Sequence, residues 1–199
     1  MKKLFAAILC VVLCFTFCGC SKTEKKNEEA REALLKVLNK EQNFTVKSLV
    51  FDRTSEENLS KFFYNSVHSA MNAFSSEIYA FVDFDSDGVE ELMVTGIGDR
   101  CSLILRYDDG VVYGYLLECV SFEHIGTDGS FLIKRYEQHS ALTRISFDGV
   151  SFSTKSLAYA DEEADIYQFD YKDAPKEEVM EYIANWDKNT PKVTLEAVK

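Results

Sequence analysis

The chain has 199 residues and a formal net charge of −11 at pH 7, from 22 basic and 33 acidic side chains. A surface this acidic disfavours nucleic acid as a partner. The length suits one domain with a sizeable core and is short for two.

The first residues have the parts of an export signal. Lys2 and Lys3 form a positive start, an apolar run follows from Leu4 to Phe17, and Gly19 stands directly before Cys20. A transmembrane helix is the alternative, but it needs about 20 apolar residues, and this run is shorter. The pattern therefore predicts a cleaved signal over residues 1–19.

The segment from Phe17 to Cys20 resembles the bacterial lipobox, although Phe17 and Cys18 depart from the aliphatic and small residues usual there. The resemblance implies that Cys20 becomes the new N-terminus and carries diacylglycerol with fatty acids such as palmitate. Two acyl chains suffice for stable attachment, so the protein is expected on the extracytoplasmic side of the cell membrane. Ordinary secretion through the same signal is the alternative.

Removal of residues 1–19 takes away Lys2 and Lys3 and no acid, so the mature charge moves from −11 to −13. Residues 20–29 are rich in Lys, Glu and Asn, which predicts a flexible tether. The sequence assigns residues 30–199 to a single domain.

Helical periodicity opens this domain. Apolar residues recur at steps of three and four between Ala30 and Leu38, which predicts a helix over about residues 28–40. Thr54-Ser55-Glu56-Glu57 has capping-box spacing and predicts a second helix, with an apolar stripe from Leu59 to Phe74. Residues 44–51 fit either a strand or an extended crossing.

From Ile78 the pattern changes to short apolar runs separated by turn residues, which predicts an antiparallel meander of about six to eight strands. Asp173-Ala174-Pro175 then predicts the start of a C-terminal helix. Its expected buried stripe is Val179, Tyr182, Ile183 and Trp186. Helices, then strands, then a helix predict the α+β class, a β-meander packed by N-terminal helices and a C-terminal helix.

An acidic segment over residues 83–91 carries the clearest chemistry. Its acids stand at positions one, three, five and nine, with glycine at six and the carbonyl of Val89 at seven, which suits the oxygen ligands of calcium. An EF-hand would need Glu at position twelve, where Val94 stands, and flanking helices in place of strand-like runs. The alternative is a plain hairpin turn at Asp87-Gly88 with a solvated acidic rim.

The segment resembles the FG-GAP and VCBS type of calcium loop, Asp-x-Asp-x-Asp-Gly-x-x-Asp between two antiparallel strands, with Glu91 in place of the last Asp. The layout resembles bacterial surface lipoproteins, many from Firmicutes, with a single loop of this type. The resemblance implies calcium ligands at Asp83, Asp85, Asp87, Val89 and Glu91. Extracellular sites of this kind bind calcium at about 0.1 to 1 mM, so about 1 mM calcium stabilises the fold by about 0.4 to 1.4 kcal/mol.

Two cysteines remain for the folded domain. Cys101 and Cys119 flank the turn at Asp109-Gly110, and an exported chain permits a disulfide between them. A plain two-residue turn pairs Cys101 with Glu118, so a direct bridge needs a bulge or a longer loop. Two buried free cysteines are the alternative.

The common enzyme motifs Gly-x-Ser-x-Gly, His-Glu-x-x-His and the Gly-rich phosphate loop do not occur in the sequence. The sequence therefore predicts a calcium-stabilised extracellular binding or structural module without catalysis, whose protein or glycan partner it does not name. The alternatives are a ligand-capturing component of a transporter and a cell-wall-acting hydrolase. The hydrolase would use paired carboxylates among Glu90, Glu91, Asp161 and Glu162.

Overall fold

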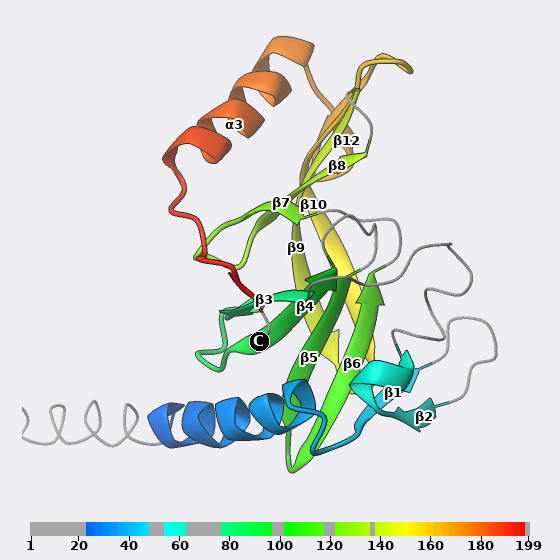
Figure 1. Cartoon of the computed structure of the whole chain (residues 1–199). Helices are drawn as coiled ribbons and strands as arrows, with labels where there is room; N and C mark the ends of the chain where they lie inside the picture. Colours follow the sequence, from blue (N-terminus) through cyan, green and yellow to red (C-terminus); the bar gives the residue numbers. More distant parts are fainter. Residues whose placement is uncertain are drawn as a thin grey trace, which may run out of the picture.

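The computed structural model describes residues 23–47, 54–62, 77–96, 102–117, 122–135 and 138–197. Their arrangement is α+β, with a β-meander, as the sequence predicts (Figure 1). The strands divide into two sheets, named here sheet A and sheet B. Within the described residues, no helix is both long enough and apolar enough to span a membrane.

Among the described residues, sheet A has seven strands and sheet B has six. In spatial order, sheet A contains β13 (Glu196–Ala197), β3 (Glu77–Val82), β4 (Glu91–Gly96), β5 (Ser102–Asp108), β6 (Val111–Leu117), β1 (Phe44–Lys47) and β2 (Thr54–Glu57). Sheet B contains β12 (Lys172–Asp173), β11 (Ile166–Phe169), β10 (Ser151–Asp161), β9 (His139–Asp148), β8 (Phe131–Arg135) and β7 (Phe122–Ile125). The β1–β6 pairing is parallel, and the other pairings between these strands are antiparallel.

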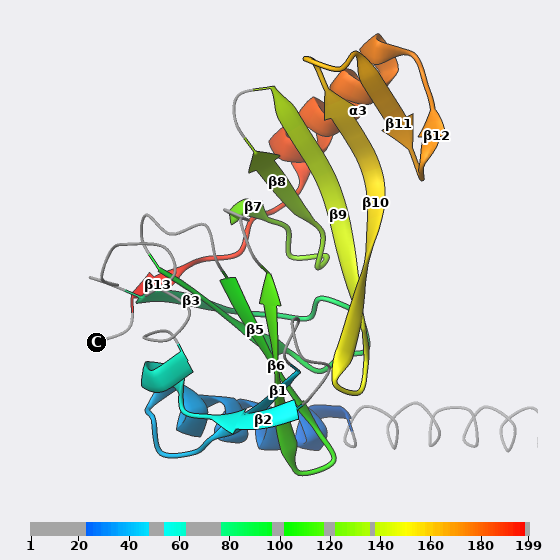
Figure 2. The same ribbon diagram turned by 90° about the vertical axis from the view of Figure 1, so that its right-hand side faces the viewer.

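Both faces of sheet A are buried. Leu103 and Leu105 on β5 pack toward the N-terminal helix (residues 23–38), whereas Ile104 between them packs toward sheet B. This alternation follows from the two-residue period of a strand. The opposite face of sheet B packs on helix α3 (Lys176–Asn189), through residues such as Leu142. The layers therefore run from the N-terminal helix through the two sheets to α3 (Figure 2).

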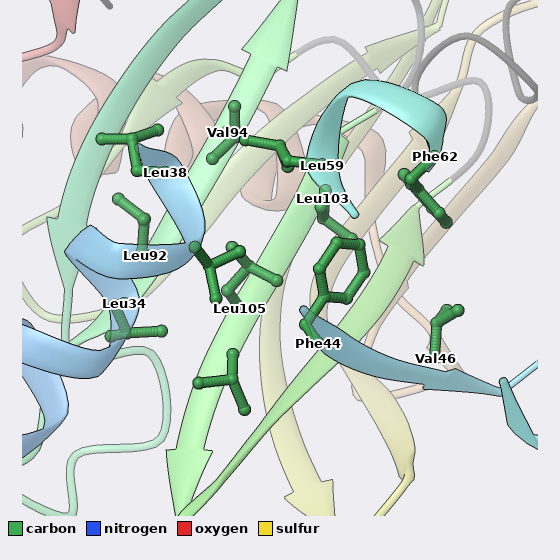
Figure 3. Packing of buried hydrophobic residues seen from close by; sticks show 12 residues of the cluster. Leu34, Leu38, Phe44, Val46, Leu59, Phe62, Leu92, Val94, Leu103 and Leu105 are labelled. Carbon is green, nitrogen blue, oxygen red and sulfur yellow. The ribbon is translucent and has the colours of Figure 1, made fainter. Parts of the chain in front are cut away.

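The N-terminal helix covers sheet A with one apolar stripe. Leu34 and Val37 have no exposed surface, and Leu38 is 5% exposed. Figure 3 shows Leu34 and Leu38 of this helix on one side of the leucines and valine of β4 and β5, and Phe44 on the other. The apolar residues whose periodicity predicted the helix are therefore the ones that the helix buries.

The helix begins earlier than the sequence indicates, because residues 23–29 are helical and not a flexible tether. The Asn27 Oδ1 accepts the backbone N–H of Glu90 at 3.0 Å, which holds this turn against the β3–β4 loop. The charged residues that suggested a tether are largely solvent-exposed, and Lys25 and Glu29 form an i,i+4 pair there. Residues 20–22 lie outside the described residues.

The predicted capping box at residues 54–57 is wrong, because these residues form strand β2 and pair with β1. The helical turn begins at residue 59, and its N-cap is Asn58 in place of the predicted Thr54. The side chain of Asn58 accepts the backbone N–H of Ser60 at 3.1 Å. Leu59 and Phe62 are buried as predicted. The rest of the predicted helix, from residue 63 to Phe74, lies outside the described residues.

Helix α3 starts close to the predicted position, with Pro175 at its N-cap, and it ends with Thr190 at its C-cap. Asp173 is not its capping residue, because it lies in β12 and accepts a hydrogen bond from Gln168 at 3.0 Å. Val179 and Ile183 are buried, whereas Tyr182 is 45% exposed. The buried face of α3 is therefore narrower than the predicted four-residue stripe, because Tyr182 does not belong to it.

The segment after α3 runs along the edge of sheet B and reaches sheet A (Figure 1). The carbonyl of Pro191 accepts the Thr127 N–H, and the Val193 N–H donates to the carbonyl of Ile125, each at 2.9 Å. The segment then forms β13, where Glu196 stands opposite Tyr79 of β3. We call residues 190–197 the C-terminal strap, since they connect both sheets.

The β5–β6 hairpin has the plain two-residue turn that the sequence predicts. Asp109 and Gly110 both have positive φ angles, 45° and 89°, as a type I′ turn requires. The described pairing runs from this turn to Ser102 opposite Leu117. Cys101 and Cys119 lie outside the described residues, so their bridging stays a prediction.

Gly129, in the turn before β8, packs directly on the β3–β4 loop. Its φ is +75°, and a Cβ atom there would stand 2.5 Å from the carbonyl oxygen of Asp83. Gly110 also has a positive φ, but a Cβ there would meet no described atom within 4 Å. Substitution of Gly110 by alanine therefore measures the cost of the strained backbone alone. Substitution of Gly129 measures that cost together with the steric clash.

We expect Gly129→Ala to lower the free energy of unfolding by about 3 kcal/mol, because the backbone must shift as well as strain. Gly110→Ala should cost only about 1 kcal/mol, for the strained φ alone. Denaturant unfolding of both variants measures the difference. Equal losses of unfolding free energy in the two variants would show that the close contact between Gly129 and the loop does not affect stability.

Candidate metal centre

The acidic loop connects β3 to β4, whose last pair is Val82 opposite Glu91. Two apolar side chains of this loop (residues 83–90), Phe84 and Val89, are buried and hold it in place. Phe84 is 1% exposed and packs edge to face on Phe131 of sheet B, with ring centroids 6.0 Å apart. Val89 is 4% exposed. The loop therefore joins two antiparallel strands, as expected, and its Phe84 side chain is anchored in the core between the sheets.

Hydrogen bonds within the loop turn backbone N–H groups toward its acids. Asp83 accepts from the N–H of Asp87 at 3.1 Å and from the N–H of Gly88 at 2.9 Å. Asp87 accepts the N–H of Val89 at 2.8 Å. Ser86 and Gly88 take positive φ angles of 62° and 85°, which closes the turn. The loop is compact because its carboxylates satisfy its own backbone.

Three carboxylates converge. Asp83, Asp85 and Glu91 each bring one oxygen to within 4.8 Å of the other two. Glu91 is 1% exposed, and its Oε2 accepts the N–H of Phe84 at 2.9 Å. Its Oε1 and the Oδ1 of Asp85 are buried with no hydrogen-bond partner among the described residues. Buried charged oxygens without partners are costly, and such oxygens are the ligands that calcium takes.

One basic side chain enters the loop from the neighbouring strand. Arg106 of β5 donates from Nη1 to Asp85 Oδ2 at 2.6 Å and from Nη2 to Asp87 Oδ2 at 3.3 Å. Its Nε lies 3.9 Å from the Oε1 of Glu91. On its other side the guanidinium carbon is 5.0 Å from the ring centre of Phe147 in β9. Arg106 therefore connects the acidic loop to sheet B.

Burial dominates the ionisation of the cluster. It raises the pKa of Glu91 to about 8, a rise that the nearby Asp85 carboxylate adds to and that the Phe84 N–H and Arg106 oppose. Burial also raises the pKa of Asp85, against the pull of Arg106. One guanidinium is thus too little positive charge to hold all these acids ionised at their ordinary pKa values.

The structure brings together three of the five residues that the loop resemblance implies as ligands. Asp87 is not among the converging carboxylates. One of its oxygens accepts the Val89 N–H, and the other accepts from Arg106. Val89, at position seven, has its side chain in the core. Whether Asp87 and the Val89 carbonyl join a bound ion stays a prediction.

Sequence reasoning missed Arg106. The pairing of Leu92 with Leu105 places Arg106 one step further along, across from Glu91. A correct register for the second hairpin would have identified this pair, because a buried acid favours a basic residue opposite it.

The acids considered for a hydrolase have other partners. Glu90 pairs with Arg31 of the N-terminal helix, and Glu162 with Lys176 of α3. Asp161, at the end of β10 in sheet B, lies 3.1 Å from the Nε2 of His139. Cys20, the expected lipidation site, lies outside the described residues.

The N-terminal helix closes the outer side of the loop. In addition to the contacts of Asn27 and Arg31 with Glu90, the Cγ2 of Thr23 lies 2.9 Å from where a Cβ of Gly88 would stand. The first turns of the helix therefore lie directly on the candidate centre.

No protein-family profile, no curated protein and no solved structure matches the chain.

In the presence of a chelator, we expect the melting temperature to fall as the pH rises from 5 to 8. Glu91 binds its proton more tightly in the folded state, with a pKa of about 8, than in the unfolded chain, so this stabilisation is complete below about pH 4.5 and is lost toward pH 8. The lowered pKa values of Asp128 and Asp161 act at lower pH, below this window.

The matched variant is Glu91→Gln, which keeps the size of the side chain and removes its titration. Its melting temperature should fall less steeply than that of the wild type between pH 5 and 8, and the raised pKa of Asp85 accounts for the decrease that remains. A slope as steep as that of the wild type would show that Glu91 is not the group responsible.

Proposed function

We propose that the mature chain, residues 20–199, is a lipid-anchored module on the extracytoplasmic face of the cell membrane, and that calcium bound by its acidic loop stabilises it. The observation that carries the calcium proposal is the pair of buried oxygens, Asp85 Oδ1 and Glu91 Oε1, that lack hydrogen-bond partners among the described residues. Asp85, Glu91 and Asp83 each bring one carboxylate oxygen to within 4.8 Å of the other two.

Calcium is the cation that this chemistry favours. The converging donors are all carboxylate oxygens, and the loop pattern adds Asp87 and the Val89 carbonyl, whereas transition metals favour histidine and cysteine. Calcium also accepts flexible, irregular coordination, which a short loop can supply.

A structural role suits the position of the loop. Its backbone contributes Phe84 to the core between the sheets, and its outer side contacts the N-terminal helix. An ion that fixes the loop would therefore stabilise two layer contacts at once. A binding or structural module held by such an ion is the function that this arrangement supports best.

The membrane anchor rests on the lipobox-like segment ending at Cys20. The described helix begins at residue 23, three positions further on. A lipid on Cys20 would thus hold the folded domain close to the bilayer surface by two acyl chains.

We expect about 1 mM calcium to raise the melting temperature by about 1 to 5 °C relative to chelator, from a stabilisation of about 0.4 to 1.4 kcal/mol. Asp85→Asn should abolish the increase, because it removes a charged ligand and keeps the side-chain shape. Asp128→Asn is the matched control, since Asp128 also lies in a turn and pairs with an arginine, Arg144. If wild type and Asp85→Asn both melt identically with calcium and with chelator, the loop is only a turn.

We expect cells expressing the full chain to incorporate radiolabelled palmitate into it, and Cys20→Ser to lose the label. Cys18→Ser serves as the control, because it changes a neighbouring cysteine and leaves the acylated position intact. Labelling of Cys20→Ser at the wild-type level would contradict the anchor.

A further inference from the structure

Arg106 lies within reach of three acids of the loop. It makes two hydrogen bonds, to Asp85 and Asp87, and lies 3.9 Å from Glu91. Its side chain is 16% exposed, and Phe147 packs against its guanidinium. A guanidinium held this way supplies positive charge to the same carboxylates that the proposed calcium ion would use.

We infer that Arg106 is the resident counter-cation of the acidic loop and that calcium binds in competition with its guanidinium. This inference rests on the proposed calcium site and adds the residue that sets the affinity of the site.

The contacts of Asp87 show why the two cations compete. One of its oxygens accepts the Val89 N–H, and the other accepts from Arg106. The loop pattern places Asp87 among the calcium ligands, so the loop can use its full ligand set only if Arg106 gives up this carboxylate. Competition therefore follows from the occupied oxygens as well as from charge.

Charge acts in the same direction. An ion bound to Asp85 Oδ1 and Glu91 Oε1 would lie beside a guanidinium that contacts the same two side chains. Like charges at such distances repel strongly where water is excluded, and Glu91 is 1% exposed. With the arginine in place, those two oxygens still have no hydrogen bond from any residue that the structure describes, so it stabilises the acids only in part.

Phe147 can hold the guanidinium of Arg106 after calcium has displaced it from the loop. Its ring already lies against Arg106 and packs on Tyr115, with centroids 4.8 Å apart. Cation–π contact with this ring does not depend on Asp87. Calcium could thus release Arg106 from the loop while the side chain keeps its contact with sheet B.

The test is calorimetric titration of calcium into the full chain, expressed with its own signal segment and purified in detergent. Arg106→Met removes the charge and keeps an apolar side chain against Phe147. Arg144→Met is the matched control, because Arg144 also pairs with a turn aspartate, Asp128, and its loss changes the net charge equally. We expect Arg106→Met to bind calcium at least tenfold more tightly than wild type, and Arg144→Met to bind within about twofold of it.

Calcium affinity of Arg106→Met equal to or weaker than that of wild type would overturn the inference and would show that the arginine holds the acids in their binding arrangement. Binding by Arg106→Met alone, with wild type silent up to 10 mM calcium, would support the inference and refute the proposed calcium stabilisation of the natural chain. Absence of binding to every variant would overturn both.

If Arg106→Met is unfolded in chelator, its refolding is followed by far-ultraviolet circular dichroism as calcium is added. Refolding below the wild-type dissociation constant supports the competition. Arg106→Lys, which keeps the charge, should bind no more than about threefold more tightly than wild type. Failure of Arg106→Met to refold, together with tight binding by Arg106→Lys, would contradict it.

Discussion

The burial of both faces of sheet A is the constraint on which the other layers depend. Residues that alternate along β5, such as Leu103 and Ile104, must each find an apolar layer, so the N-terminal helix covers one face and sheet B the other. Sheet B in turn needs α3 to cover its second face. The β3–β4 loop lies where these layers meet, and Phe84 places its backbone between the sheets. Glu91 is therefore buried by the packing of the fold and Asp85 partly so, whereas Asp87 stays exposed. The side chain that reaches these two more buried acids, Arg106, comes from a neighbouring strand.

The acidic loop shows how a fold accommodates a buried carboxylate with incomplete compensation. Glu91 receives one backbone N–H and a distant guanidinium, and burial still raises its pKa to about 8. A structure that needed only a turn between β3 and β4 would be more stable with an apolar residue in place of Glu91. One oxygen of Glu91 has no hydrogen-bond partner among the described residues, and the calcium proposal starts from this oxygen.

The local features of the fold could be predicted from the sequence, and the long-range ones could not. The hairpin at Asp109-Gly110 and the N-terminal stripe depend on neighbours a few residues apart, so turn chemistry and periodicity identify them. Residues 54–57 were misassigned because their spacing fits a helix cap, whereas pairing with the distant β1 makes them a strand. The acids of the candidate site were evident in one short segment. Arg106 was not, because its role depends on the register between β4 and β5.

The C-terminal strap determines when sheet A can be completed during synthesis. Strand β13 pairs with β3, and the hydroxyl of Tyr79 donates to Glu196, a residue 117 positions later in the chain. Sheet A therefore reaches its final edge only after residue 197 has been synthesised, although most of its strands emerge much earlier. Until then the outer edge of β3 presents unpaired backbone groups to its surroundings. An edge of this kind can pair with another chain, so the strap also shields β3 from intermolecular strand pairing.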